Sequence, residues 1–217
     1  MTGPLTFAFD TSGPHCGAAL LTGETLVAAA VEEMAKGQAE RLMDFCAEVL
    51  RAGGARWSDL DRLAVGTGPG NFTGLRISVA AARGLALGLG IPAIGVSNLE
   101  AQAFGFDGPV VSALDARRDH FYLQSFGMPV PVPPLLCDLG ALPASLRGAA
   151  PLCVGHRAAE IAEQTGGSIA RQTLPVAETV ARVSITRGDD CHPRPAPLYI
   201  RPADAAPARD EPPVILS

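Results

Sequence analysis

The feature that most constrains the fold of this chain is a weak internal repeat. Residues 5–21 contain LTFAFD and, six residues later, GAALL; residues 110–126 contain VVSALD and, five residues later, FYLQSF. In each copy an apolar strand ends in an aspartate and a hairpin returns. Two such copies predict two related subdomains that face each other across a cleft, with Asp10 and Asp115 at its mouth.

The remaining pattern predicts an α/β protein. Apolar runs joined by short turns indicate an antiparallel meander, and strands alternating with helices indicate that the sheet is partly parallel. We expect subdomains over 1–106 and 107–202 and a tail over 203–217. The expected strands are 5–9, 17–21, 25–31, 63–65, 93–96, 110–115, 121–126 and 151–154, the expected helices are 37–50, 74–89, 157–164 and 176–187, the proline-rich 129–150 is expected to be a loop with a short helix, and 197–201 is expected to be ordered.

Composition excludes several classes of protein. The chain is 47% hydrophobic and 18% charged, which favours a globular protein with a sizeable core. Its net charge of −5 provides no general attraction for nucleic acid or an anionic membrane. Five widely spaced cysteines without a Cys-x-x-Cys pair suggest neither a disulfide framework nor a zinc ribbon. We therefore expect a cytoplasmic protein with reduced cysteines and no membrane association.

Residues 63–76 (LAVGTGPGNFTGLR) form a glycine-rich loop between a predicted strand and a predicted helix. The loop matches neither GxxxxGK[ST] nor GxGxxG. Thr73 is the predicted N-cap, and Arg76 would oppose the helix dipole. A structural ion pair between Arg76 and a carboxylate is favoured over a contact with a ligand phosphate. The expected structural residues of the loop are Gly68, Pro69, Gly70, Thr73, Gly74 and Arg76.

Two other features have open alternatives. Within the apolar helix 74–89, Ala80, Gly84 and Gly88 recur every four residues, a stripe that suits close packing either inside the monomer or at a subunit interface. Asp10 taken alone is favoured as a turn initiator over the end of a metal or phosphate site. The four histidines form no His-x-x-x-His pair and no triad is indicated, so neither a metal site nor catalytic residues are predicted.

Several motifs together are similar to one known family. DTS at 10–12, GPGNFTGLR at 68–76, GLA at 84–86, IGVS at 94–97, DAR at 115–117 and PLYIR at 197–201 resemble the TsaB (YeaZ) family, the non-catalytic subunit of the bacterial machinery that makes threonylcarbamoyladenosine in tRNA. The resemblance implies an actin, hexokinase and Hsp70-like (ASKHA) duplicated fold, in which each subdomain has a meander-led mixed sheet with flanking helices.

The resemblance also implies a function. Members of this family pair with TsaD, the paralogue that transfers threonylcarbamoyl to the adenosine beside the anticodon and holds a metal through a His-x-x-x-His motif. The chain would be a scaffold with no catalytic residues or cofactor of its own, working with TsaD and a TsaE-type ATPase, on which ATP and metal are expected, and meeting tRNA through the complex. The alternative is a phosphotransferase of the same fold or a glycoprotease-like hydrolase.

The resemblance implies two groups of site residues. The first two helices would pack against those of TsaD, or of a second copy, as a four-helix bundle, and we further hypothesise a vestigial cleft. Relatives often have His where Gln38 stands and a second Gly where Arg157 stands, which weakens the case for nucleotide binding. The interface residues are Leu42, Phe45, Val49, Ile77, Ala80, Ala81, Gly84 and Gly88, and the cleft residues are Asp10, Thr11, Ser12 and Asp115.

Overall fold

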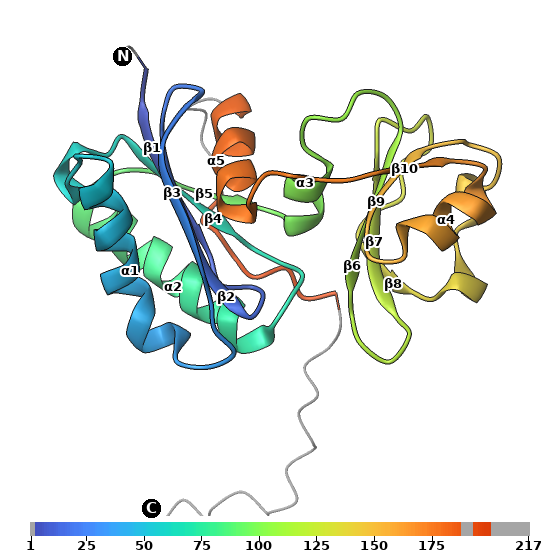
Figure 1. Ribbon diagram of the computed structural model, residues 1–217, viewed down its shortest axis with the longest axis horizontal. Helices are drawn as coiled ribbons and strands as arrows, with labels where there is room; N and C mark the ends of the chain where they lie inside the picture. The colour runs from blue at the N-terminus through green and yellow to red at the C-terminus, as the bar shows by residue number, and fades with distance from the viewer. Residues whose placement is uncertain (1–2, 188–192, 201–217) are drawn as a thin grey trace, which may run out of the picture.

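Two mixed sheets of five strands each stand side by side in the computed structural model, which describes residues 3–187 and 193–200 (Figure 1). Three short 3-10 turns accompany the regular elements. The elements are β1 (Leu5–Asp10), β2 (His15–Thr22), β3 (Thr25–Glu33), α1 (Gln38–Ala52), β4 (Arg62–Gly66), α2 (Phe72–Leu89), β5 (Ala93–Val96), α3 (Asn98–Ala103), β6 (Val110–Asp115), β7 (Phe121–Phe126), β8 (Leu135–Cys137), β9 (Leu152–Gly155), α4 (Ala158–Thr165), β10 (Ser168–Ala170) and α5 (Val176–Thr186).

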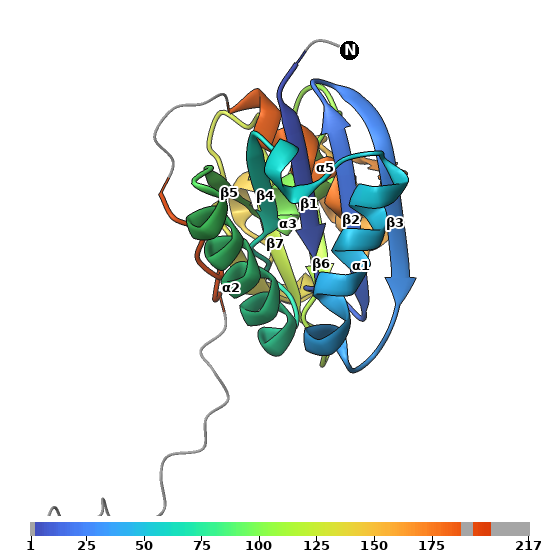
Figure 2. The same ribbon diagram turned by 90° about the vertical axis from the view of Figure 1, so that its left-hand side faces the viewer.

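The first sheet has the strand order β3-β2-β1-β4-β5. β1 pairs antiparallel with β2 and parallel with β4, so the predicted meander and the predicted parallel portion share one sheet. Because side chains alternate along a strand, Phe7 and Phe9 of β1 face α1 and α2, whereas Ala8 faces α5. Figure 2 shows α1 and α2 covering the outer face of this sheet.

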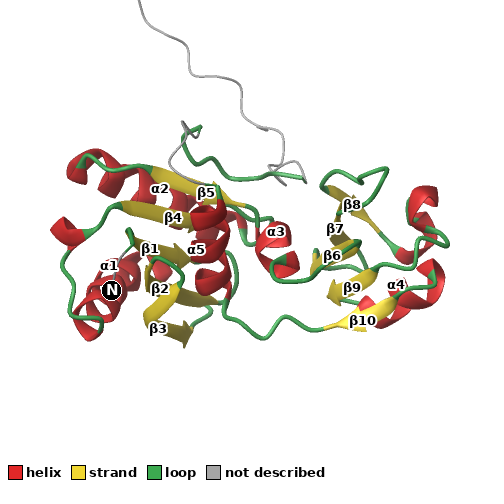
Figure 3. Cartoon of the chain, turned by 90° about the horizontal axis from the view of Figure 1, so that it is seen from above, coloured by secondary structure: helices red, strands yellow, loops and turns green. Residues whose placement is uncertain are grey.

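The second sheet repeats this arrangement with the order β10-β9-β6-β7-β8. β6 pairs antiparallel with β7 and parallel with β9, as β1 does with β2 and β4. α4 lies on the outer side, and α3 and α5 lie between the two sheets (Figure 3). The internal repeat and the predicted fold class are therefore confirmed.

Several boundaries differ from the sequence prediction. The expected loop over 129–150 contains β8, and the elements α3 and β10 were not predicted. α5 packs against β1, β2 and β4, so a helix from the range 107–202 belongs to the layer of the first sheet. The predicted bounds of the subdomains remain a prediction, and the predicted tail, 203–217, lies outside the described residues.

Candidate functional site

A cleft of about 820 Å³ lies between the two sheets. The loops that follow β1, β4 and β6 form its walls, so the carboxyl ends of strands from both sheets meet there. The crossover before α5 and the first turns of α5 close it. Its lining residues are Ser12, Gly13, Pro14, His15, Ala35, Pro69, Gly70, Asn71, Phe72, Asn98, Gln102, Leu114, Asp115, Ala116, Arg117, Tyr122, Gln172, Leu174, Val176 and Thr179.

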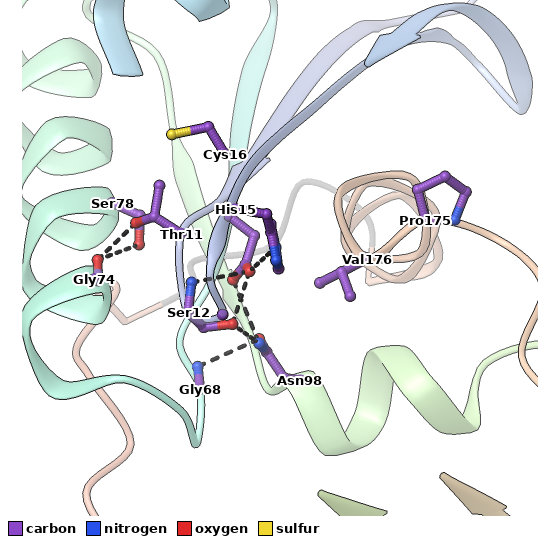
Figure 4. Close-up of polar contacts among 12 residues, drawn as sticks. Thr11, Ser12, His15, Cys16, Gly68, Gly74, Ser78, Asn98, Pro175 and Val176 are labelled. Atoms are coloured by element: carbon purple, nitrogen blue, oxygen red, sulfur yellow. Dashed lines mark hydrogen bonds and ion pairs between the residues drawn. The ribbon is translucent and has the colours of Figure 1, made fainter. Parts of the chain in front are cut away.

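Asp10 is completely buried beneath this cleft and is absent from its lining. Its Oδ1 accepts hydrogen bonds from the Ser12 backbone N–H at 3.0 Å and the Ser12 hydroxyl at 2.7 Å, and it lies 3.1 Å from His15 Nε2. Its Oδ2 accepts from Asn98 Nδ2 at 3.4 Å, and Figure 4 shows Ser12, His15 and Asn98 converging on one point. Both carboxylate oxygens are thus bound to groups of the chain itself.

The charge of Asp10 has a partner within the fold. The hydrogen bond to Asp10 raises the pKa of His15 above its ordinary value, burial lowers it, and the negative charges of Asp10 and Glu33 raise it further. The protonated form of His15 is therefore favoured, and it would form an ion pair with Asp10. A metal ion at Asp10 would have to displace this pair.

The four predicted cleft residues do not act as a group. Ser12 and Asp115 line the cleft, but Thr11 points toward α2, where its hydroxyl donates to the Gly74 carbonyl at 2.7 Å. Asp115 is exposed, in contrast to Asp10, and its Oδ1 accepts from the Arg117 N–H at 2.9 Å. The two aspartates are equivalent in the repeat but differ in burial and partners.

Two amides that organise this region were not predicted to do so. The buried Gln38 side chain donates to the carbonyls of Gly13 at 2.7 Å and His15 at 2.8 Å, which fixes the turn between β1 and β2. Asn98 bridges Asp10 and the Gly68 N–H, at 3.3 Å from its Oδ1. The available signal was its position shortly after the end of β5, at the same edge of the sheet as Asp10 at the end of β1.

The described residues contain no group of three or more His, Cys, Asp or Glu side chains that could hold a metal ion. Cys16, Cys46, Cys137 and Cys153 are free and buried, whereas Cys191 lies outside the described residues. Burial raises the pKa of the Cys46 thiol strongly and that of Cys137 to about 11. The thiol form therefore dominates at neutral pH, and these two cysteines are poor nucleophiles.

The glycine-rich loop packs against the end of β1. A Cβ added to Gly70 would lie 2.5 Å from the Ser12 carbonyl oxygen, and one added to Gly74 would lie 1.9 Å from that of Thr11. The predicted N-cap Thr73 is wrong: α2 begins at Phe72, and the Asn71 side chain caps it by accepting from the Thr73 N–H. These glycines permit close approach to neighbouring backbone.

Arg76 does not have the expected carboxylate partner among the described residues. Its guanidinium carbon lies 3.7 Å from the centre of the Phe72 ring, and its Nε donates to the Tyr199 hydroxyl at 3.0 Å. The segment 193–200 brings Tyr199 there, since the Leu198 N–H donates to the Thr67 carbonyl at 2.8 Å. Within the described residues the expected Arg76 ion pair is not formed, and aromatic rings take the place of the carboxylate.

The predicted interface residues fall into two groups. Ala80, Gly84 and Gly88 are exposed, and a Cβ added to either glycine would meet no atom within 4 Å. Ile77 and Ala81 are half-buried against the core that α1 and α2 form with the first sheet. The predicted interface role fails for Leu42, Phe45 and Val49 of α1. These three side chains face the first sheet and are at most 4% exposed.

The open face of α2 carries small and apolar residues together with the exposed Arg76 and Arg83. Leu87 is 84% exposed beside Gly84 and Gly88. By length and composition alone α2 is long and apolar enough to cross a membrane, but one such helix is weak evidence for a membrane protein. Only 28% of the helix is buried within the structure. An apolar helix with so much uncovered surface is typical of an interaction site.

Comparisons with known proteins point to one family. A family model described as TsaD, tRNA N6-adenosine threonylcarbamoyltransferase, matches residues 31–128. The tRNA threonylcarbamoyladenosine biosynthesis protein TsaB of Escherichia coli is 38% identical over 124 residues, 55% of this chain and 53% of that protein. TsaB of Bacillus subtilis is 37% identical over 118 residues, 53% of this chain and 52% of that protein. The chain thus spans about half the length of the curated relatives it matches.

The solved structure of YeaZ from Pseudomonas aeruginosa covers 92% of this chain and 100% of its own, with a TM-score of 0.72 and 25% identity. The resemblance to TsaB and YeaZ is confirmed. A component of (R)-2-hydroxyglutaryl-CoA dehydratase from Acidaminococcus fermentans shares the fold at 12% identity, with a TM-score of 0.51. Together these likenesses support the ASKHA fold expected for TsaB.

Proposed function

We propose that the chain is a non-catalytic subunit that pairs with a TsaD-type partner in the complex that transfers threonylcarbamoyl to the tRNA adenosine beside the anticodon. The observation that carries the proposal is the exposed face of α2 around Ala80, Gly84 and Gly88. Small residues on this row let a partner helix approach closely, and Leu87 offers an apolar side chain beside them. The assignment to threonylcarbamoyladenosine biosynthesis rests on the names of the TsaB homologues.

The chemistry of the cleft supports a scaffold. The Asp10 carboxylate at the end of β1 is not available to a metal or a substrate, because both of its oxygens are engaged by Ser12, His15 and Asn98. We propose that this subunit holds no cofactor of its own, and that ATP and metal act on partner subunits, including a TsaE-type ATPase. tRNA would be met through the complex, in the cytoplasm.

The size of the cleft favours a second candidate, an ASKHA-fold phosphotransferase or a glycoprotease-like hydrolase. A cleft of about 820 Å³ is within the range of small-molecule sites. Calorimetry of the isolated chain with ATP and Mg²⁺ separates the two candidates. The scaffold proposal expects no tight binding, and tight binding would favour the phosphotransferase.

Pairing is tested by Gly84→Leu, which places a bulky side chain on the open row where nothing in the monomer obstructs it. We expect a folded monomer that no longer forms a heterodimer with a TsaD-type partner in size-exclusion chromatography at micromolar concentration. Glu163→Leu is the matched control, because it adds an exposed leucine on α4, away from α2. A heterodimer retained by Gly84→Leu would refute the assigned face.

Reconstitution of tRNA modification tests the role itself. With the partner subunits, ATP and tRNA present, omission of this chain should abolish or strongly reduce threonylcarbamoyl transfer, and adding it back should restore the reaction. Transfer by the TsaD-type subunit that is unchanged by the omission would contradict the scaffold function.

A further inference from the structure

Arg76 is held in an unusually defined position for an exposed arginine. Its guanidinium lies over the Phe72 ring, at 3.7 Å from the ring centre, and Tyr199 stands beside it, with the two ring centres 5.1 Å apart. The Tyr199 hydroxyl accepts from Nε at 3.0 Å, which fixes the rotation of the planar group. Stacking and one hydrogen bond thus orient the guanidinium before any partner arrives.

The guanidinium retains unused donors. Of its five N–H groups, the one on Nε is engaged by Tyr199, and the described residues offer no hydrogen-bond acceptor to the four on the Nη atoms. These four form the fork that matches a carboxylate or phosphate in a bidentate arrangement. Arg76 therefore has the geometry to bind an anion.

The electrostatics of α2 favour the same kind of ligand. The helix contains Arg76 and Arg83 and no acidic residue, although the chain as a whole has a net charge of −5. Arg76 also lies near the helix N-terminus, where the dipole disfavours a cation. An anion placed at Arg76 would relieve this unfavourable interaction.

The position of Arg76 indicates which anion is relevant. Arg76, Ala80, Gly84 and Gly88 are spaced by four residues, so they form one row on the helix, and all four are exposed. Arg76 therefore stands at the end of the row assigned above to partner docking. Recognition of nucleic acid would call for several cations along the surface, whereas the rest of this row is small and uncharged.

We infer that Arg76 is a preformed recognition site for an aspartate or glutamate side chain of the protein subunit that docks on α2. Phe72 and Tyr199 are positioning residues, because they act through Arg76. Through Tyr199, the segment 193–200 would contribute to partner binding although it belongs to neither α1 nor α2. This inference rests on the proposed pairing with a TsaD-type subunit.

The test measures the dissociation constant of the heterodimer by calorimetry at low and high salt, for the wild type and for Arg76→Gln, Arg76→Lys and Tyr199→Phe. We expect Arg76→Gln to weaken binding roughly ten- to a hundredfold and to reduce its salt dependence. Arg76→Lys keeps the charge but loses the fork, so a clear loss should remain. Tyr199→Phe keeps the ring and should weaken binding by about threefold. Arg147→Gln, an exposed arginine in the second subdomain, should bind like the wild type.

The outcomes separate this inference from the proposed function. A wild-type chain that does not bind the partner would overturn the proposed function before any variant is made. Normal binding by the wild type together with unchanged binding by Arg76→Gln would overturn the inference and leave the function standing. Loss of tRNA binding by Arg76→Gln with normal pairing would show that an RNA phosphate, not a carboxylate, is recognised. Circular dichroism of each variant confirms that its fold is intact.

Discussion

Two glycines of α2 should respond in opposite ways to the same substitution. Alanine is favoured over glycine inside a helix by about 1 kcal/mol, and this gain applies at Gly74 and at Gly84. At Gly84 a Cβ meets no atom within 4 Å, so Gly84→Ala should stabilise the fold by about 1 kcal/mol. At Gly74 the Cβ would lie 1.9 Å from the Thr11 carbonyl oxygen, a backbone atom at the end of β1. The two elements would have to separate there.

The cost of this separation determines the sign at Gly74. Overpacking a close contact costs about 1–3 kcal/mol, and a clash with backbone belongs at the upper end. After the gain in helix propensity, Gly74→Ala should destabilise the fold by about 2 kcal/mol, so the variants should differ by about 3 kcal/mol. The Thr11 hydroxyl, which donates to the Gly74 carbonyl, would lose its geometry in the same movement.

Urea unfolding followed by circular dichroism measures both changes, at a protein concentration low enough to prevent self-association. In thermal unfolding a change of 1 kcal/mol shifts the melting temperature by about 2–4 °C, so the melting temperatures of the two variants should differ by about 6–12 °C. Equal shifts would contradict the packing of α2 against the end of β1. Destabilisation by Gly84→Ala would mean that the face assigned to a partner is covered within the monomer.

Two further predictions concern the core and the buried ion pair. Leu42→Ala should destabilise the monomer by about 2–5 kcal/mol, because Leu42 is buried. Met43→Ala, at the exposed neighbouring position, should cost less than about 1 kcal/mol in the same unfolding assay. Equally small costs for both variants would contradict the burial of Leu42 and support its predicted interface role. Because Asp10 raises the pKa of folded His15, the stability that this pair contributes is fully present below the unfolded pKa of about 6.5 and is lost as the pH rises through the folded pKa. The urea midpoint of the wild type minus that of His15→Gln should therefore decrease as the pH rises above about 6.5, and a constant difference would contradict the pairing.

The sequence predicted the long elements and the duplication, because apolar periodicity extends over each helix and each central strand. It missed α3, β8 and β10, which have six, three and three residues and are too short to show a period. It also identified the apolar face of α1 without indicating what covers that face. Leu42 satisfies the spacing of a core residue and of an interface residue equally well, and its burial against the first sheet decides between them.

Polar roles in the site depended on distant partners. The hydrogen bond from Asn98 to Asp10 joins residues 88 positions apart, and the one from Arg76 to Tyr199 joins residues 123 apart. The helix dipole predicts an acidic group near Arg76, but the described residues place the rings of Phe72 and Tyr199 beside it. No local pattern identifies a tyrosine 123 positions away as the contact.

The glycines of GTGPGNFTG let the loop and α2 pack closely against the backbone of the chain itself. Gly66, at the end of β4, leaves room for the Asp10 carboxylate, since a Cβ there would lie 2.0 Å from Oδ2. Gly70 and Gly74 bring the loop and α2 against the backbone that follows β1. In a phosphate-binding loop the glycines leave room for the ligand, whereas here the atoms of Asp10, Ser12 and Thr11 fill the space beside them. The same contacts position the start of α2, and with it the exposed row to which we assign partner docking.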